Sequence, residues 1–168
     1  MRNRLIALFA MSCALHGAQA GDAGTPCRRL LRAVQCATVP LAGADEDAEA
    51  KRFQPPPDGR ARVYVLRPGT MAPAVKSTIL LDGRPMRELA PQTYAVIDTS
   101  AGTHRIAART DRDAEIELDL EPGRIRYVEN RFSLLFFTVS GQLRPLEAQP
   151  AQAAIAQSRL VKSGAEGE

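Results

Sequence analysis

The sequence predicts a mainly β protein: an antiparallel β-sandwich of about seven to nine strands, with a short N-terminal helix and a C-terminal helix. Short runs of apolar or alternating residues recur at close spacing along most of the chain. Turn residues such as Asp-Gly, Pro-Gly and Ala-Gly separate these runs. No helical pattern alternates with the strands, so the parallel sheet of an α/β protein is not expected.

The first 20 residues have the pattern of a bacterial secretory signal peptide. Met1–Arg4 is basic, Leu5–Leu15 is apolar, and Ala18-Gln19-Ala20 fits a small-residue cleavage site. The apolar stretch is too short to span a bilayer, so we expect cleavage between Ala20 and Gly21 and export to the periplasm. The alternative is a retained membrane anchor. No later stretch is long and apolar enough to predict a transmembrane segment in the mature chain.

The composition favours one small domain with tails and disfavours nucleic-acid binding. The chain has 168 residues and a formal charge of +3. Arg2 and Arg4 lie in the predicted signal peptide, and their removal leaves a charge of about +1. Nucleic-acid binding needs a clear basic surplus on one face, so we expect no nucleic-acid partner.

Two of the three cysteines remain after the predicted cleavage, because Cys13 lies in the signal peptide. Cys27 and Cys36 are an even number of thiols in an oxidising compartment, which predicts a disulfide that closes a small loop. The alternative is two free thiols. No Cys-x-x-Cys motif occurs, so a catalytic cysteine is not expected.

Residues 21–58 are predicted to form a leader that precedes the β domain. Arg28–Val34 fits a short helical turn. Ala44–Phe53 fits a better helix, with acidic residues at its start and basic residues at its end. Three prolines, Pro55–Pro57, then predict an extended linker and a domain boundary, with the β domain over residues 59–147.

The first half of the β domain is predicted to contain four strands. In Arg60–Arg67, apolar residues occupy both alternating sets, which predicts a strand covered on both faces. Lys76–Asp82 follows, and Asp82-Gly83 is the strongest hairpin signal in the chain. Pro85–Leu89 fits an edge strand, because proline cannot donate to a ladder. Thr93–Asp98 is the fourth strand.

The second half begins at the Gly102 turn and the strand Thr103–Arg109. Glu115–Leu120 alternates between acidic and apolar residues, which predicts a half-buried strand whose acidic face pairs with the basic face of Arg124–Tyr127. An apolar strand over Leu134–Val139 and a turn at Gly141-Gln142 lead to a last strand, Leu143–Leu146. Residues 148–168 are predicted to form a helix over Ala151–Val161 and a frayed tail.

Four stretches together resemble a bacterial family, domain of unknown function 2846: Pro55–Gly69, Leu81–Gly83, Leu89–Tyr94 and Ala101–His104. Their order is also similar to the PEGA type of small surface β domain. The resemblance covers roughly residues 45–145 and rests mainly on turn and core residues. It implies an exported, envelope-associated β domain, often lipid-anchored, with no catalytic residues.

Lipidation is the alternative to a soluble periplasmic form. Many relatives have the motif Cys36–Pro40 directly after a lipobox, but here the preceding Arg32–Gln35 is not apolar enough. The residues before Cys13 also make a poor lipobox. Lipidation at either cysteine would anchor the protein to a membrane.

His104 is the one histidine of the mature chain and the weak functional candidate. It shares a strand face with Ile106 and Ala108, and we expect a packed or edge histidine. Asp82 and Asp98 flank the central hairpin and could approach each other, although turn capping is the commoner role of such residues. No phosphate loop, nucleophile elbow or zinc motif occurs, so no catalytic, cofactor or metal residue is predicted.

We therefore expect a non-enzymatic envelope module that binds an envelope protein or a cell-wall component, with strand addition at a sheet edge as the mechanism. The alternative is a small periplasmic hydrolase or metal-dependent enzyme that uses His104 and nearby carboxylates. A concave site that places His104 beside two carboxylates or a serine would favour the enzyme.

Overall fold

A computed structural model of the protein describes residues 36–135 and 138–163. The predicted signal peptide, its cleavage between Ala20 and Gly21, Cys13, Cys27, the helical turn in the leader and the frayed tail beyond residue 163 lie outside the described residues. The Cys27–Cys36 disulfide therefore stays a prediction. Within the described ranges, no helix is long and apolar enough to cross a membrane.

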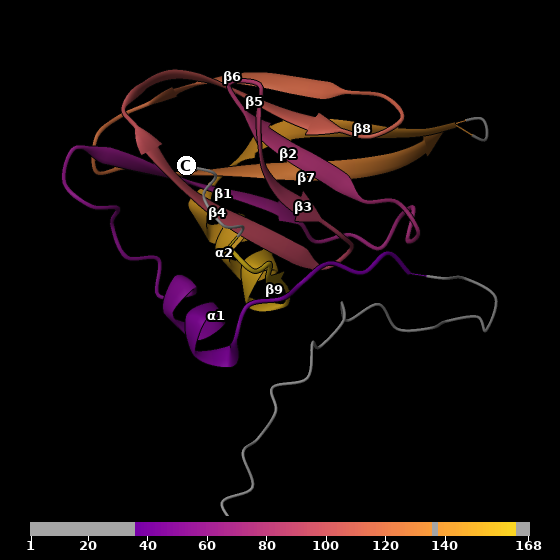
Figure 1. Ribbon diagram of the computed structural model, residues 1–168, viewed down its shortest axis with the longest axis horizontal. Helices are drawn as coiled ribbons and strands as arrows, with labels where there is room; N and C mark the ends of the chain where they lie inside the picture. The colour runs from indigo at the N-terminus through magenta and orange to yellow at the C-terminus, as the bar shows by residue number, and fades with distance from the viewer. Residues whose placement is uncertain (1–35, 136–137, 164–168) are drawn as a thin grey trace, which may run out of the picture.

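Over the described residues, the fold consists of two β-sheets and two helices (Figure 1). A five-stranded sheet has the order β8-β7-β1-β4-β9, and a four-stranded sheet has the order β3-β2-β5-β6. The mainly β architecture predicted from the sequence is confirmed. In chain order the elements are α1 Ala44–Ala50, β1 Arg60–Arg67, β2 Ser77–Leu81, β3 Arg84–Leu89, β4 Thr93–Ser100, β5 Gly102–Arg109, β6 Ala114–Leu120, β7 Ile125–Leu135, β8 Thr138–Leu146, α2 Ala148–Ala156 and β9 Arg159–Leu160.

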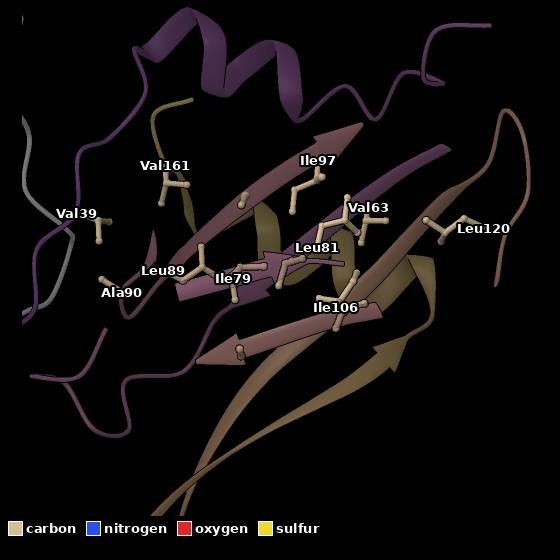
Figure 2. Close-up of a cluster of buried hydrophobic side chains, with 14 of the residues drawn as sticks. Val39, Val63, Ile79, Leu81, Leu89, Ala90, Ile97, Ile106, Leu120 and Val161 are labelled. Carbon is tan, nitrogen blue, oxygen red and sulfur yellow. The ribbon is translucent and has the colours of Figure 1, made fainter. Parts of the chain in front are cut away.

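Strand β1 is buried on both faces, as its residue pattern predicts. One face, with Val63 and Val65, packs in the core between the two sheets (Figure 2). The other face, with Tyr64 and Leu66, packs against Ala151 and other residues of the helical layer. The molecule therefore has three layers: the four-stranded sheet, the five-stranded sheet, and α1 and α2 on the outer face of the latter.

The pairing differs from a purely antiparallel sandwich at two places. The four-stranded sheet is antiparallel throughout. In the five-stranded sheet, however, β1 pairs with β7 in parallel, and β4 pairs with β9 in parallel. These pairs join segments far apart in the sequence, so no local turn residues predict them.

The predicted course of the chain after β6 was wrong in detail. β6 pairs with β5 and not with the strand that follows it, because β7 enters the other sheet. The predicted strand Leu134–Val139 is divided between β7 and β8, which form one long hairpin. Gly141 does not turn the chain but lies within β8, opposite Phe132.

The predicted helix Ala151–Val161 was also misplaced. α2 begins earlier and ends at Ala156, and after a two-residue turn Arg159 and Leu160 form β9. There the N–H groups of Arg159 and Val161 donate to the carbonyls of Gln92 and Tyr94. This pairing with β4 outweighs the local helical preference of the segment.

The described part of the predicted leader packs as part of the fold. Val39 is buried in the core between the sheets, and Ala42 is buried in the helical layer. Leu41 bridges to Val161, and Phe53 lies 5.5 Å from Tyr64 between ring centroids. α1 spans Ala44–Ala50, three residues shorter than predicted at its C-terminal end, since the chain turns at Lys51 and Arg52.

Candidate functional site

His104, on β5, joins two turns through its ring nitrogens. Nδ1 lies 2.7 Å from Oδ2 of Asp82, at the β2–β3 turn. Nε2 lies 3.1 Å from the carbonyl oxygen of Ser100 and 3.3 Å from its Oγ. The second carboxylate oxygen of Asp82 accepts the backbone N–H of Arg105 at 2.9 Å. Asp82 and His104 therefore fasten the β2–β3 turn to the beginning of β5.

The turn residues named from the sequence, Asp82, Gly83 and Gly102, adopt backbone conformations with positive φ. Asp82 and Gly83 have φ values of 50° and 81°, the left-handed conformation that a two-residue hairpin turn with the strand twist requires. Gly102 has φ 125°, which a residue with a side chain rarely adopts. These three positions have structural roles at the ends of β2 and β5.

Asp82, His104 and Ser100 follow one another in the order acid, imidazole, hydroxyl, as in a hydrolase triad. The geometry fits a structural role for His104 better than a catalytic one, because the Ser100 carbonyl oxygen lies nearer to Nε2 than the Ser100 hydroxyl does. A hollow of about 450 Å³ lies beside His104, but Ser100 is not among the described residues that line it. The His104 side chain is only 11% exposed. Asp82, Glu115 and Glu117 line the same hollow, so His104 does lie in a concave site beside carboxylates. Its ring, however, is held by Asp82 and the Ser100 carbonyl rather than directed at the hydroxyl. The enzyme therefore stays the alternative hypothesis.

Asp82 is expected to make a pH-dependent contribution to stability. The backbone N–H of Arg105 and, next, the His104 side chain lower the pKa of Asp82. A lowered folded-state pKa stabilises the fold above the ordinary Asp pKa of about 3.9, and the contribution is lost as the pH falls through the folded-state value. We expect Asp82→Asn to be less stable than the unchanged protein at pH 6, and the difference to shrink as the pH falls below the ordinary Asp pKa and through the lowered folded-state value.

Urea unfolding at pH 6 and near pH 2.5 measures this difference. Asp111→Asn, at an exposed position in the β5–β6 connection, is the matched control and should show no difference at either pH. A destabilisation by Asp82→Asn that is the same at both pH values would contradict the assignment.

The other acidic candidates have their own partners. Asp98 does not meet Asp82 but binds Arg62 through both oxygens, at 2.6 and 2.7 Å. On the outer face of the four-stranded sheet, Glu115 lies 3.6 Å from Arg105 across the β5–β6 ladder. Over the ranges that the structure describes, no group of three or more His, Cys, Asp or Glu side chains is suited to hold a metal ion.

A larger groove follows the edge of β4. β9 pairs with β4 only at Thr93 and Tyr94, and no other described strand pairs with the rest of this edge. The groove measures about 950 Å³. Its floor includes Val96, Ile97 and Asp98, and its walls come from α1, the Pro-rich segment, β3 and the residues around β9.

The backbone of β4 directs polar groups into this opening. The carbonyl of Tyr94 accepts the N–H of Val161, so Tyr94 faces away from β1. Backbone direction alternates along a strand, so the N–H and C=O groups of Val96 and Asp98 also face away from β1. The Arg60 side chain donates to the Asp98 carbonyl at 2.6 Å and so occupies one of the acceptors on this edge.

The groove combines apolar surface with charges of both signs. Met86, Val96 and the prolines Pro55–Pro57 supply the apolar part. Arg60, Arg62 and Arg87 supply positive charge, and Glu46, Glu49 and Asp98 supply negative charge. Such a lining suits an extended polypeptide with mixed side chains better than a small molecule of one charge.

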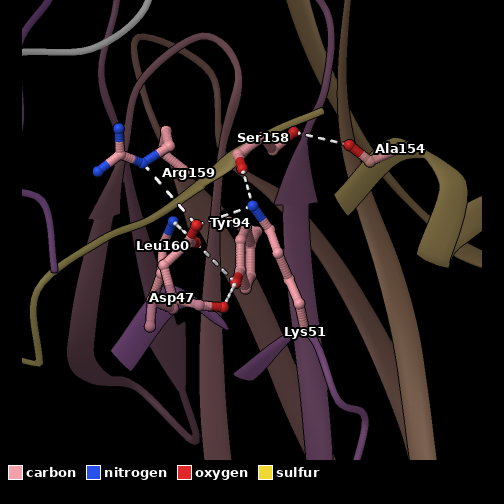
Figure 3. Close-up of polar contacts among 7 residues, drawn as sticks. All are labelled: Asp47, Lys51, Tyr94, Ala154, Ser158, Arg159 and Leu160. Atoms are coloured by element: carbon pink, nitrogen blue, oxygen red, sulfur yellow. Dashed lines mark hydrogen bonds and ion pairs between the residues drawn. The ribbon is translucent and has the colours of Figure 1, made fainter. Parts of the chain in front are cut away.

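A buried carboxylate, Asp47 on α1, holds one wall of the groove in place (Figure 3). Its Oδ1 accepts the Leu160 N–H at 2.8 Å and the Tyr94 hydroxyl at 2.9 Å, and its Oδ2 binds Lys51 Nζ at 2.8 Å. Lys51 also donates to the Ser158 carbonyl at 2.8 Å. Burial alone would raise the pKa of Asp47, but hydrogen bonds from Lys51, Leu160 and Tyr94 together lower it.

Comparisons with known proteins identify a family. The family model described as "Protein of unknown function (DUF2846)" matches residues 57–141. The chain belongs to this family. An uncharacterised protein of Haemophilus influenzae is 24% identical over 129 residues, which cover 76% of this chain and 77% of that protein. No solved structure matches.

The DUF2846 match covers β1 to β7 and the first part of β8. α1, α2 and β9 lie outside it, so part of the groove wall comes from beyond the matched residues. The sequence did not reveal the groove or the role of Asp47. Asp47 was recognised only as one of three acidic residues at a helix start, and the Asp47–Leu160 contact spans 113 residues of sequence. Asp45 and Glu46 are exposed, whereas Asp47 is buried, and a single sequence does not indicate which of the three acidic residues is buried.

Proposed function

We propose that this DUF2846 protein is an exported, non-enzymatic envelope module that binds an extended segment of another envelope protein in the groove along β4. Export is inferred from the N-terminal signal pattern. The observation that carries the binding role is the length of β4 beyond Tyr94 that no described strand pairs with, together with the groove beside it. An extended segment would add to the sheet there by main-chain hydrogen bonds.

The position of the edge supports this mode of binding. The part of β4 beyond its short pairing with β9, and β3, the edge strand of the other sheet, border the same groove. A segment paired with β4 would place alternate side chains toward Met86 of β3 and toward the Pro-rich segment. Main-chain bonds would supply affinity, and these two walls would select side chains.

Selection of peptides tests the proposal. We expect a random displayed peptide library, panned against the purified protein, to yield extended apolar-polar sequences that bind with micromolar affinity. Val96→Pro removes an N–H that faces the groove and leaves the bonds to β1 intact, so it should weaken binding about tenfold or more. Met86→Asp adds a charge to the opposite wall and should weaken binding without touching the backbone of β4.

Glu117→Pro is the matched control. Arg105 directs its carbonyl to β2, so residues 104, 106 and 108 face β6, and Glu117 of β6 faces outward on the other sheet. This variant removes an edge N–H far from the groove and should bind the selected peptides normally. Equal loss in Glu117→Pro, or no effect of either groove variant, would contradict the proposal.

A further inference from the structure

The chain leaves β9 along the same edge of β4 that borders the groove. β9 runs parallel to β4 and pairs with it as far as Tyr94. The residue after β9 continues this ladder, because the N–H of Val161 donates to the Tyr94 carbonyl at 2.9 Å. Val161 and Ser163, the last described residue, both line the groove. The segment that follows β9 therefore starts at the wall of the groove.

Backbone direction alternates regularly along this stretch. The N–H groups of Arg159 and Val161 donate to carbonyls of β4 and the turn before it. The N–H of Lys162 points the other way and donates to the Pro40 carbonyl. Because this alternation has a period of two residues, the N–H and C=O of Ser163 would face β4 again if the strand continued. The start of the tail is therefore directed so that it can extend β9.

The register of β9 assigns a partner to each open group of β4. In a parallel ladder, the N–H and the C=O of one residue bond to two residues of the neighbouring strand that are two positions apart. Since the Val161 N–H bonds to Tyr94, the Val161 C=O is in register with the Val96 N–H. The Ser163 N–H is then in register with the Val96 C=O, and the Ser163 C=O with the Asp98 N–H. These are the groups of β4 that face the groove.

The tail, Ser163–Glu168, has the composition to lie in a groove with unneutralised positive charge. Its residues are Ser, Gly, Ala, Glu, Gly and Glu, so it has small side chains and two carboxylates. The Arg60 side chain lies at the Asp98 end of the groove, where it donates to the Asp98 carbonyl. No carboxylate of the described residues forms an ion pair with Arg60 or with Arg87, which also lines the groove. A tail paired with β4 would bring Glu166 toward this positive charge.

We propose that Ser163–Glu168 extends β9 along β4 and competes with bound peptides for the groove, an inference that rests on the proposed peptide-binding function. The tail has no large apolar side chain to place against Met86, so it pairs weakly, and a partner segment with such side chains displaces it. Because the tail is tethered beside the edge, its local concentration is about millimolar, and even weak pairing occupies the edge for part of the time. The Val96 and Asp98 amides therefore stay open often enough to exchange hydrogen faster than the amides that face β1.

A proline at the first residue of the tail tests this competition. Ser163→Pro removes the N–H that would bond to the Val96 carbonyl, whereas Gly164→Pro removes an N–H that would face away from β4. In the full chain, we expect Ser163→Pro to speed hydrogen exchange at the Val96 and Asp98 amides about threefold and to tighten binding of the selected peptides by a similar factor. Gly164→Pro should produce neither effect. Ser163→Ala, which removes only the hydroxyl that donates to Glu46, should produce neither effect as well.

The two measurements separate this inference from the proposed function. Normal peptide binding, with neither affinity nor exchange changed by Ser163→Pro, would overturn the competition by the tail and leave the binding role of the groove standing. Faster exchange in Ser163→Pro, without any peptide binding, would support the pairing of the tail with β4 and contradict the proposed function. Equal effects of Ser163→Pro and Gly164→Pro would overturn the proposal, because only the former removes a main-chain bond to β4.

Discussion

Replacement of Asp47 by alanine is expected to lower the free energy of unfolding by about 2–4 kcal/mol. The Asp47 side chain is 12% exposed and joins α1, β4 and the segment of β9. Its removal leaves the Leu160 N–H and the Tyr94 hydroxyl buried without this acceptor, and it leaves the Lys51 ammonium without its counter-charge. Urea unfolding followed by circular dichroism measures the loss.

Two further variants separate the causes. Asp47→Asn keeps an oxygen acceptor but not the charge, so its loss should be smaller than that of the alanine variant. Glu49→Ala, on the same helix, removes only an exposed ion pair with Arg52 and should change stability by less than about 0.5 kcal/mol. A loss for Asp47→Ala no larger than that for Glu49→Ala would show that the buried contacts do not hold the helical layer.

The Asp47 contribution should also depend on pH. The folded-state pKa of Asp47 is lowered, so its contribution is present above the ordinary Asp pKa and is lost as the pH falls through the lowered value. The stability difference between the unchanged protein and Asp47→Asn should therefore narrow in acid.

Replacement of Tyr64 by alanine is expected to cost about 3–5 kcal/mol, because it opens a large cavity in the helical layer. Tyr64 is fully buried on β1, and its ring centroid lies 5.5 Å from Phe53, 6.2 Å from Tyr94 and 5.4 Å from Tyr127. Its hydroxyl donates to the Ala50 carbonyl of α1 at 2.7 Å.

Tyr64→Phe separates the hydrogen bond from the packing. It retains the ring and should cost about 0.5–1.5 kcal/mol, the usual range for one hydrogen bond. Equal losses for the two variants would mean that the ring is not enclosed by α1, α2 and its aromatic neighbours. That result would contradict the three-layer arrangement.

The local parts of the fold could be predicted from the sequence. Arg60–Arg67 was predicted with its observed bounds, since both alternating residue sets are apolar. The Asp82-Gly83 hairpin followed from the residue types that tolerate positive φ. In contrast, the run from Leu134 to Val139 contains no turn residue, so the sequence did not indicate that the chain reverses within it.

The parts that depend on distant contacts could not be predicted. The parallel pairing of β1 with β7 has no local signature, and β9 forms only because β4 offers an edge. The length of β4 that stays unpaired depends on where β9 stops, so the groove could not be located from the sequence. His104 was expected to be a packed or edge histidine, but its bond to Asp82 could not be predicted without the register between β2 and β5.

Hydrogen exchange at the amides of β4 tests the binding role most directly. In the free protein, the amides of Val96 and Asp98 should exchange faster than those of Ala95 and Ile97, which face β1. A selected peptide should slow exchange at Val96 and Asp98 and leave Ala95 and Ile97 nearly unchanged. Peptide binding that leaves Val96 and Asp98 unprotected, or full protection of both before any peptide is added, would contradict the proposal that β4 is the binding edge.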